Sequence, residues 1–211
     1  MDTRNNLPTG FIDIDMLGPP HVLPASPVLR QGETGPQPIT RSRAMVVEDA
    51  TSATKSAKLS PVVSQNLSTL TDAQIINYLS GVGNWSKHVH SSQWTAAPRT
   101  PFDIELSQGG SHAGEGCFVL VWITDPNAWF MANELAITAG NPASANELYD
   151  LRIHDFDAQN PGQDPKPRVA SFKMQSRLNP RYASYNLGLI LEQSDGLRLP
   201  TFYDPKIKND G

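Results

Sequence analysis

The residues best placed for chemistry in this sequence are two histidines, His88 and His90, which stand one position apart. On a β-strand this spacing points both side chains to one face, because successive side chains alternate between faces. Two neighbouring imidazoles can begin a zinc, iron or copper site. His88 and His90 are therefore candidate metal ligands, and the alternative is a pair of surface or hydrogen-bonded histidines.

A second candidate site lies in the run 154–164, where Asp155 and Asp157 begin a series of oxygen-bearing side chains that suits calcium. An EF-hand counted from Asp155 needs Gly at the sixth position and Glu at the twelfth, but Asn160 and Lys166 stand there. The EF-hand loop is excluded. A looser calcium site is one interpretation, and a strand end that runs into a Pro-Gly turn is the other.

The sequence contains no motif for nucleophilic catalysis or for phosphate binding. The chain has no G-x-S-x-G elbow, and Cys117 stands inside the apolar run 117–123, where a buried and inert thiol is expected. The Gly-rich stretch 109–116 has neither a P-loop lysine nor a following helix. We therefore expect no enzyme, no catalytic residue and no cofactor.

One helix precedes the strands that would position these residues. Thr71 and Gln74 have the spacing of a capping box, in which a hydroxyl and an amide satisfy the first backbone groups of a helix. Ile75 and Leu79 then share one face, and Gly81 ends the pattern. This predicts a helix over 72–80.

Alternation with period two, the pattern of half-buried strands, dominates the rest of the chain. It runs through 102–107, 170–175 and 185–192, while 118–123 is apolar on both faces, as in a central strand. Shorter strand candidates lie at 85–96, 134–138, 149–156 and 197–203.

About eight short strands separated by turn residues predict an all-β fold, an antiparallel eight-stranded jelly-roll sandwich. In such a sandwich we expect the apolar faces of 102–106 and 187–191 to lie opposite each other across the two sheets. The sandwich would occupy residues 71–211.

Residues 1–70 differ in composition from the rest of the chain. Of 16 aromatic residues only Phe11 lies among them, whereas they hold 8 of the 18 prolines. Aromatic side chains supply much of a protein's buried area, so this stretch has little with which to build a core. We expect residues 1–70 to form a long extended N-terminal arm, and the alternative is a disordered tail.

Apolar residues in the arm and two tryptophans are candidates for contacts between subunits. The arm has one clear apolar island, 11–17, and a weaker one, 44–47, and an extended segment of this kind can add to the sheet edge of a partner. Aromatic residues are enriched at subunit contacts. The candidate contact residues are Phe11, Ile12, Ile14, Met16, Leu17, Val46, Val47, Trp94 and Trp129.

The charge distribution argues against nucleic acid as a main partner. Residues 1–70 carry six basic and six acidic side chains, so the formal net charge of −4 belongs to the remainder. A segment that condenses on phosphates needs clustered Lys and Arg. No apolar run has the length of a signal peptide or a membrane span, so we expect little direct nucleic-acid binding and no membrane span.

The layout of the chain resembles the coat proteins of small non-enveloped RNA viruses, especially the picorna-like group. The features that carry the resemblance are the arm 1–70, the helix 72–80, the strand entry 84–95 and the closing segment 177–191. The resemblance implies a structural capsid protein that forms an icosahedral shell by subunit packing and N-terminal arm exchange. It also implies other copies and sister capsid proteins as partners, together with a host receptor, and a place in the virion after assembly in the host cytoplasm.

Two other classes of protein remain as alternatives. The first is a ligand- or carbohydrate-binding β-sandwich that displays Trp94 or Trp129 on an open face. The second is a metalloenzyme, because an H-x-H pair in a predicted jelly roll resembles the cupin family. Cupins place a Glu a few residues after the pair, where this chain has Trp94 and Thr95, and neither His112 nor His154 has the context of the second cupin motif.

Overall fold

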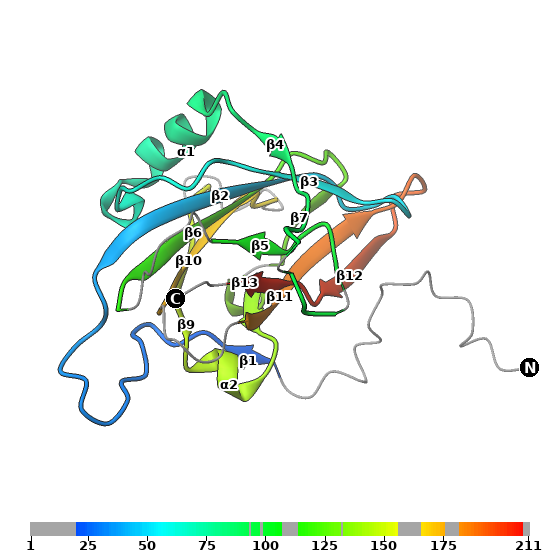
Figure 1. Ribbon diagram of the computed structural model, residues 1–211. Coiled ribbons are helices and arrows are strands. Elements are labelled where there is room, and N and C mark those ends of the chain that lie inside the picture. Colours follow the sequence, from blue (N-terminus) through cyan, green and yellow to red (C-terminus); the bar gives the residue numbers. More distant parts are fainter. Residues whose placement is uncertain are drawn as a thin grey trace, which may run out of the picture.

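Two mixed β-sheets pack against each other in the computed structural model, with short helices at the periphery (Figure 1). The structure describes residues 20–92, 94–97, 99–106, 114–131, 133–155, 166–175 and 182–208. The all-β sandwich class predicted from the alternation patterns is confirmed at this level.

The first sheet, called the β6 sheet here, is built around two long central strands. Its order is β4 (Ser86–Lys87), β3 (Ser56–Leu59), β2 (Ile39–Asp49), β6 (Gly116–Ile123), β10 (Val169–Met174) and β9 (Leu148–Ile153). β2 and β6 run parallel, with Met45 beside Val121, and the other neighbours in this sheet run antiparallel.

The second sheet, called the β11 sheet here, is organised around the longest C-terminal strand. Its order is β1 (His21–Val22), β8 (Ile137–Ala139), β11 (Tyr182–Glu192), β13 (Lys206–Lys208) and β5 (Ile104–Glu105), and β7 (Ala128–Phe130) and β12 (Arg198–Tyr203) also pair with β11. β13 and β5 are parallel, whereas β11 is antiparallel to its neighbours.

The core lies between the two sheets and draws on both. Met45, Val121 and Phe172 from the β6 sheet are fully buried in one cluster with Tyr185 and Leu189 from the β11 sheet. The rings of Phe172 and Tyr185 meet across the interface with their centroids 5.7 Å apart. Burial of such apolar surface is the main favourable term in folding.

Helix α1 (Asp72–Gly81) covers the outer face of the β6 sheet (Figure 1). The predicted capping box is present, since the Thr71 hydroxyl accepts from the Gln74 N–H and the Gln74 side chain accepts from the Thr71 N–H. Ile75 and Leu79 pack on Phe118 in a second apolar cluster. The helix predicted over 72–80 is confirmed.

Short helical segments complete the described secondary structure. They are α2 (Pro142–Ala145) and two 3₁₀ turns, η3 (Leu67–Thr69) and η4 (Asn133–Leu135). Within the described residues, no helix is both long and apolar enough to cross a membrane.

The prediction of an arm over the whole of 1–70 is wrong for its second part. Residues 39–59 supply β2 and β3, and β2 lies in the interior of the β6 sheet between β3 and β6. The weak island 44–47 is apolar on both faces because both are covered: Met45 and Val47 face the core between the sheets, and Ala44 faces the cluster under α1. A four-residue run buried on both sides leaves no alternation in the sequence.

Two finer features of the predicted fold also differ. The sheets are mixed rather than antiparallel, and β1, β2 and β3 raise the number of strands above the predicted eight. The apolar faces of 102–106 and 187–191 do share one core, but β5 and β11 belong to the same sheet. They lie opposite the β6 sheet, not opposite each other.

Candidate functional site

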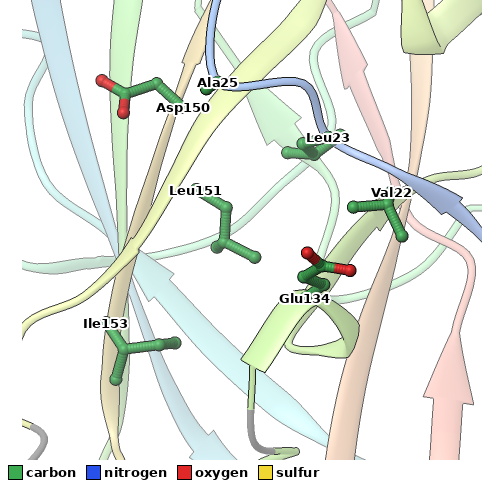
Figure 2. Close-up of a pocket in the computed structure, with 7 residues that line it drawn as sticks. All are labelled: Val22, Leu23, Ala25, Glu134, Asp150, Leu151 and Ile153. Atoms are coloured by element: carbon green, nitrogen blue, oxygen red, sulfur yellow. The ribbon is translucent and has the colours of Figure 1, made fainter.

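A pocket opens along one edge of the sandwich, where β1 ends the β11 sheet and β9 ends the β6 sheet. It has a volume of about 660 Å³. Figure 2 shows the aliphatic side chains of Val22, Leu23, Leu151 and Ile153 directed toward a common space. The lining residues are Val22, Leu23, Ala25, Glu134, Asp150, Leu151 and Ile153. We call this region the open edge.

A bulge in β9 places the aliphatic residues of the open edge. The register between β9 and β10 shifts between Ser171 and Lys173, and Asp150 has a positive φ of 57°. Such a bulge re-aims the side chains that follow it. Leu151 and Ile153 therefore turn toward the sandwich interior and pack on the rim of the core while remaining only partly buried.

Two carboxylates line the open edge: Figure 2 shows that of Glu134 among Val22, Leu23 and Leu151, whereas that of Asp150 is directed away from them. Asp150 pairs with Lys173 at 2.8 Å and with Arg152 at 3.2 Å, and its backbone N–H donates to the carbonyl of Pro24. Burial alone would raise the pKa of Asp150, but the hydrogen bonds from Lys173 and Arg152 outweigh burial and lower it. The negative charge of Asp150 is therefore balanced by Lys173 and Arg152, and five of the seven lining residues are aliphatic, so the pocket suits an aliphatic segment.

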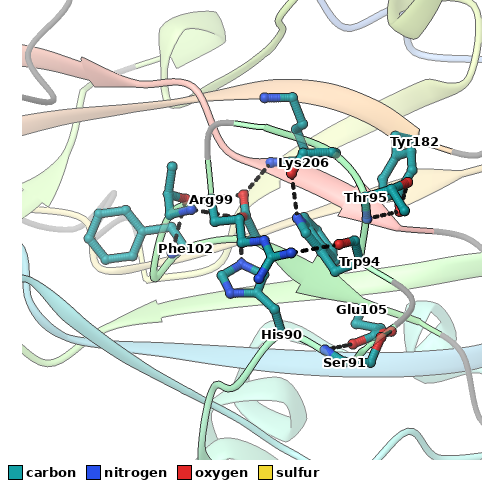
Figure 3. A network of polar contacts seen from close by, with 12 residues as sticks. His90, Ser91, Trp94, Thr95, Arg99, Phe102, Glu105, Tyr182 and Lys206 are labelled. Atoms are coloured by element: carbon teal, nitrogen blue, oxygen red, sulfur yellow. Dashed lines mark hydrogen bonds and ion pairs between the residues drawn. The ribbon is translucent and has the colours of Figure 1, made fainter.

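The opposite edge of the sandwich is closed by a polar network that links the segment after β4 to β5 (Figure 3). At its centre is Asp103, which has no solvent exposure. Its carboxylate accepts from the N–H groups of Thr100 and Lys206 at 2.7 and 2.8 Å, and a 2.7 Å hydrogen bond joins it to His90 Nε2. The Thr100 hydroxyl donates to it as well, at 3.1 Å, so each oxygen of this buried carboxylate has two hydrogen-bond partners. We call this region the closed edge.

A buried ion pair lies beside Asp103 in the closed edge. Lys208 Nζ donates to Glu105 Oε1 at 2.8 Å, and the hydroxyl of Ser91 donates to the same carboxylate. Burial would raise the pKa of Glu105, but the bonds from Lys208 and Ser91 outweigh it and bring the pKa to about 2. Glu105 therefore stays ionised near neutral pH and is not available there as a proton donor.

Trp94 forms the lid of the closed edge. It is 1% exposed, its ring centroid lies 4.7 Å from that of His90, and its indole N–H donates to the carbonyl of Ala96. The guanidinium of Arg99 donates to the Trp94 carbonyl. Figure 3 shows these side chains gathered from the segment after β4, next to Lys206 at the start of β13.

The structure does bring His88 and His90 together, with ring centroids 4.6 Å apart. His90 Nε2 is held by Asp103, and burial together with the nearby His90 lowers the pKa of His88 to about 4. Among the described residues there is no group of three or more His, Cys, Asp or Glu side chains arranged to hold a metal ion. His90 therefore belongs to the hydrogen-bonded cluster, whereas the Nε2 atom of His88 is buried without a hydrogen-bond partner in the described part of the chain and His88 contacts His90 ring to ring.

One row of hydrogen bonds has the residue types of a hydrolase triad: Ser171, His154 and Asp72. His154 Nδ1 lies 2.6 Å from Asp72 Oδ1, and His154 Nε2 lies 2.7 Å from Ser171 Oγ. A catalytic triad exposes the serine to substrate and buries the acid. Here Ser171 is 0% exposed and the Asp72 side chain is 66% exposed. These two hydrogen bonds connect the first turn of α1 to β10, and the buried Ser171 is not accessible to a substrate.

The remaining predicted site residues have structural partners or lie outside the described residues. The Asp155 carboxylate accepts from the backbone N–H groups of Arg168 and Val169, which fixes the ends of β9 and β10. Asp157 lies outside the described residues. Cys117 is buried, as predicted, and burial raises its pKa to about 11.

Four of the predicted subunit-contact residues are buried within their own chain, so they do not offer a surface to another subunit. Val47 and Trp94 are at most 1% exposed, Trp129 is 3% and Val46 is 5% exposed. The other contact candidates, Phe11, Ile12, Ile14, Met16 and Leu17, lie outside the described residues. Burial of Trp94 and Trp129 also removes the exposed rings on which the carbohydrate-binding alternative depended.

Sequence reasoning did not find the open edge. The sequence predicts a strand over 149–156, but nothing in it shows that this strand ends a sheet. Val22 and Leu23 stood in the proline-rich stretch assigned to the arm. The one local signal is the alternation of Leu151 and Ile153 with Arg152.

No protein-family model, no curated protein and no solved structure matches this chain. The functional proposal therefore rests on the residues and their geometry.

Proposed function

We propose that this chain is a structural capsid protein of a small, non-enveloped, picorna-like virus and builds an icosahedral shell by packing its sandwich against other copies and sister proteins. In this proposal it resides in the virion, after assembly in the host cytoplasm, binds little nucleic acid and has no enzymatic activity. The jelly-roll connectivity is retained only as a prediction, since the parallel pairs β2–β6 and β13–β5 depart from an all-antiparallel jelly roll.

One observation carries the proposal: the sandwich leaves an aliphatic pocket open at the edge where its N-terminal segment is attached. Val22 lines the pocket, and residues 1–19 precede it by only a few positions. Those residues contain the apolar island 11–17, which has too few neighbours in sequence to form a core. A partly exposed aliphatic edge and an apolar segment too short to form its own core suit self-assembly, because each weak contact is multiplied in a closed symmetric shell.

The internal use of the polar side chains supports the same conclusion. The Asp103 and Glu105 carboxylates are buried in hydrogen bonds of their own chain, and Ser171 is sealed under α1. Such groups stabilise the subunit and do not face a substrate. Because these buried polar groups stabilise their own chain, the protein fits the role of a structural subunit better than that of a catalyst.

The proposal is tested by the size distribution of the purified full chain in sedimentation velocity, followed by electron microscopy of the fast fraction. A capsid subunit is expected to give large closed particles of uniform diameter, alone or when expressed with its sister proteins. A single species at the 23.0 kDa of one chain under all these conditions would contradict it.

A further inference from the structure

We infer that residues 11–17 of a second copy of this chain add as a strand beside β9 and bury Ile12, Ile14 and Met16 in the open edge. This inference rests on the proposed assembly function and names the segment and the site of contact. Four features of the described residues and of the sequence support it.

The first feature is the incomplete burial of the pocket wall. Leu151 and Ile153 pack on the rim of the core but stay partly exposed, and Val22 is 40% exposed. Elsewhere in the sandwich the residues facing the core are sealed, as at Leu189, which is 0% exposed. Covering aliphatic surface of this kind gains roughly 25 cal/mol for each Å² removed from water.

The second feature is the position of β9 at the end of its sheet. β9 pairs with β10 along one side and has no strand beside it along the other among the described residues, where the Asp150 N–H donates to the Pro24 carbonyl. The stretch from Leu151 to Ile153 therefore offers a strand edge next to an apolar pocket. Extended peptides bind such edges through their backbone, with alternate side chains entering the pocket.

The third feature is the alternation of apolar and acidic residues in the segment 11–17. In the sequence Phe11-Ile-Asp-Ile-Asp-Met-Leu17, Ile12, Ile14 and Met16 alternate with Asp13 and Asp15. On a strand beside β9, the residues level with Leu151 and Ile153 point inward and those level with Arg152 point outward. The aliphatic side chains then enter the pocket while an aspartate comes to lie beside Arg152.

The fourth feature is the charge at the outer face of β9. The Arg152 side chain is 52% exposed, and Lys173 of β10 lies within 2.8 Å of the same carboxylate that Arg152 contacts. The single carboxylate of Asp150 therefore pairs with two cations, which leaves this group of three residues with a positive charge in excess. Asp13 and Asp15 carry the charge that complements this excess, while the Glu134 carboxylate lies among Val22, Leu23 and Leu151 (Figure 2).

The linker favours a second copy over the same chain as the donor. Gly18 is followed by Pro19 and Pro20, whose rings fix φ and whose predecessors prefer extended backbone. A segment returning to its own pocket would have to reverse direction between residue 17 and Val22, across this stiff stretch. An extended linker instead carries Ile14, six positions before Pro20, up to roughly 20 Å outward from its own sandwich, toward the pocket of an adjoining copy.

Cysteine pairing on the full chain tests this inference. Ile14→Cys protein is mixed with Leu151→Cys or Ile153→Cys protein, assembled and oxidised, and the products are separated without reductant. The native Cys117 does not interfere because it is buried. Matched controls replace Ile14→Cys by Asp13→Cys, which has the opposite parity, or Leu151→Cys by Val89→Cys, which is 75% exposed and outside the pocket.

The expected result is a disulfide-linked pair of chains with Ile14→Cys and at least tenfold less with either control. A disulfide within one chain, formed by the double variant Ile14→Cys/Leu151→Cys at every protein concentration, would overturn the second copy as the donor. Absence of any linkage in wild-type-like particles would overturn the docking site and leave the proposed function standing. A wild type that never assembles would overturn both.

A second measurement needs no substitution in the protein. A synthetic peptide of residues 10–19 is added to the wild-type chain before assembly. It should compete for the open edge and reduce particle formation several-fold, while the same peptide with Ile14→Asp should not. Equal effects of the two peptides would contradict insertion of Ile14.

Discussion

The two edges of the sandwich differ in how the core is covered where the sheets end. At the closed edge, the loop that follows β4 crosses to β5 and seals the gap with Asp103, Glu105 and Trp94. At the open edge, β1 and β9 leave a pocket of about 660 Å³ lined by half-covered aliphatic residues. Both edges are places where the two sheets end, but only at the closed edge do side chains of the same chain cover the core.

The chemistry of the two edges fits this difference. Buried charges need partners at fixed positions, so a closed edge made of ion pairs and hydrogen bonds must be completed during folding of the subunit. Aliphatic surface is less demanding, because its burial is non-directional and roughly proportional to area. An edge left aliphatic can be completed later by a segment from elsewhere. The closed edge therefore serves the fold, and we propose that the open edge serves assembly.

The largest expected effect comes from breaking the ion pair of the closed edge. Glu105→Gln keeps the size of the side chain but leaves the buried ammonium of Lys208 without its countercharge. Loss of one partner of a buried pair costs roughly 3–5 kcal/mol, which should appear as a lower free energy of unfolding in urea. The matched control is Glu48→Gln in the exposed pair with Lys58, where the loss should be below about 1 kcal/mol. Equal losses would show that the closed edge contributes no special stability.

Two leucine truncations compare the sealed core with the open edge. Leu189→Ala removes a fully buried side chain and should lower the free energy of unfolding by roughly 2–5 kcal/mol. Leu151→Ala removes the same atoms from a partly exposed position at the pocket, so its cost should be near ~1 kcal/mol. The check is urea unfolding of both variants in parallel. If Leu151→Ala matches Leu189→Ala, the pocket wall belongs to the sealed core.

The pH dependence of stability should report on His88 in the closed edge. Burial lowers its folded pKa to about 4, so between that value and the unfolded value of roughly 6.5 the unfolded chain binds more protons. Stability should therefore fall as the pH drops through this window. His88→Gln should show a smaller change in urea midpoint between about pH 7 and about pH 5 than the wild type. The Glu105 contribution is lost only at lower pH, between roughly 4.5 and its folded value of about 2. An unchanged difference in the variant would contradict the burial of a neutral His88.

Local signals in the sequence predicted the elements that depend on local interactions. The capping box of Thr71 and Gln74 fixed the start of α1, and the apolar run from residue 118 predicted the central strand β6. The capping box is visible because it is satisfied within four residues of chain, and the β6 run is visible because burial of both faces makes it continuously apolar.

The features missed by sequence reasoning are pairings between distant parts of the chain. β2 contains Arg41 and Arg43 and was placed in the arm, but Arg41 is 3% exposed and donates to the carbonyl of Leu106. The burial of that guanidinium depends on a residue 65 positions away. Likewise, the open edge exists only because β1 and β9 are the last strands of their sheets, a property of strand order that no single segment carries.

The most direct test of the account compares the wild type with Val22→Glu and Val89→Glu by sedimentation velocity at equal concentration. Val22 is 40% exposed and lines the pocket, whereas Val89 is 75% exposed outside it, so neither charge should change the free energy of unfolding by more than about 1 kcal/mol. The account predicts large particles for the wild type and Val89→Glu and a shift of Val22→Glu to single chains. Particles of unchanged size from a folded Val22→Glu protein would contradict the assignment of the open edge to assembly.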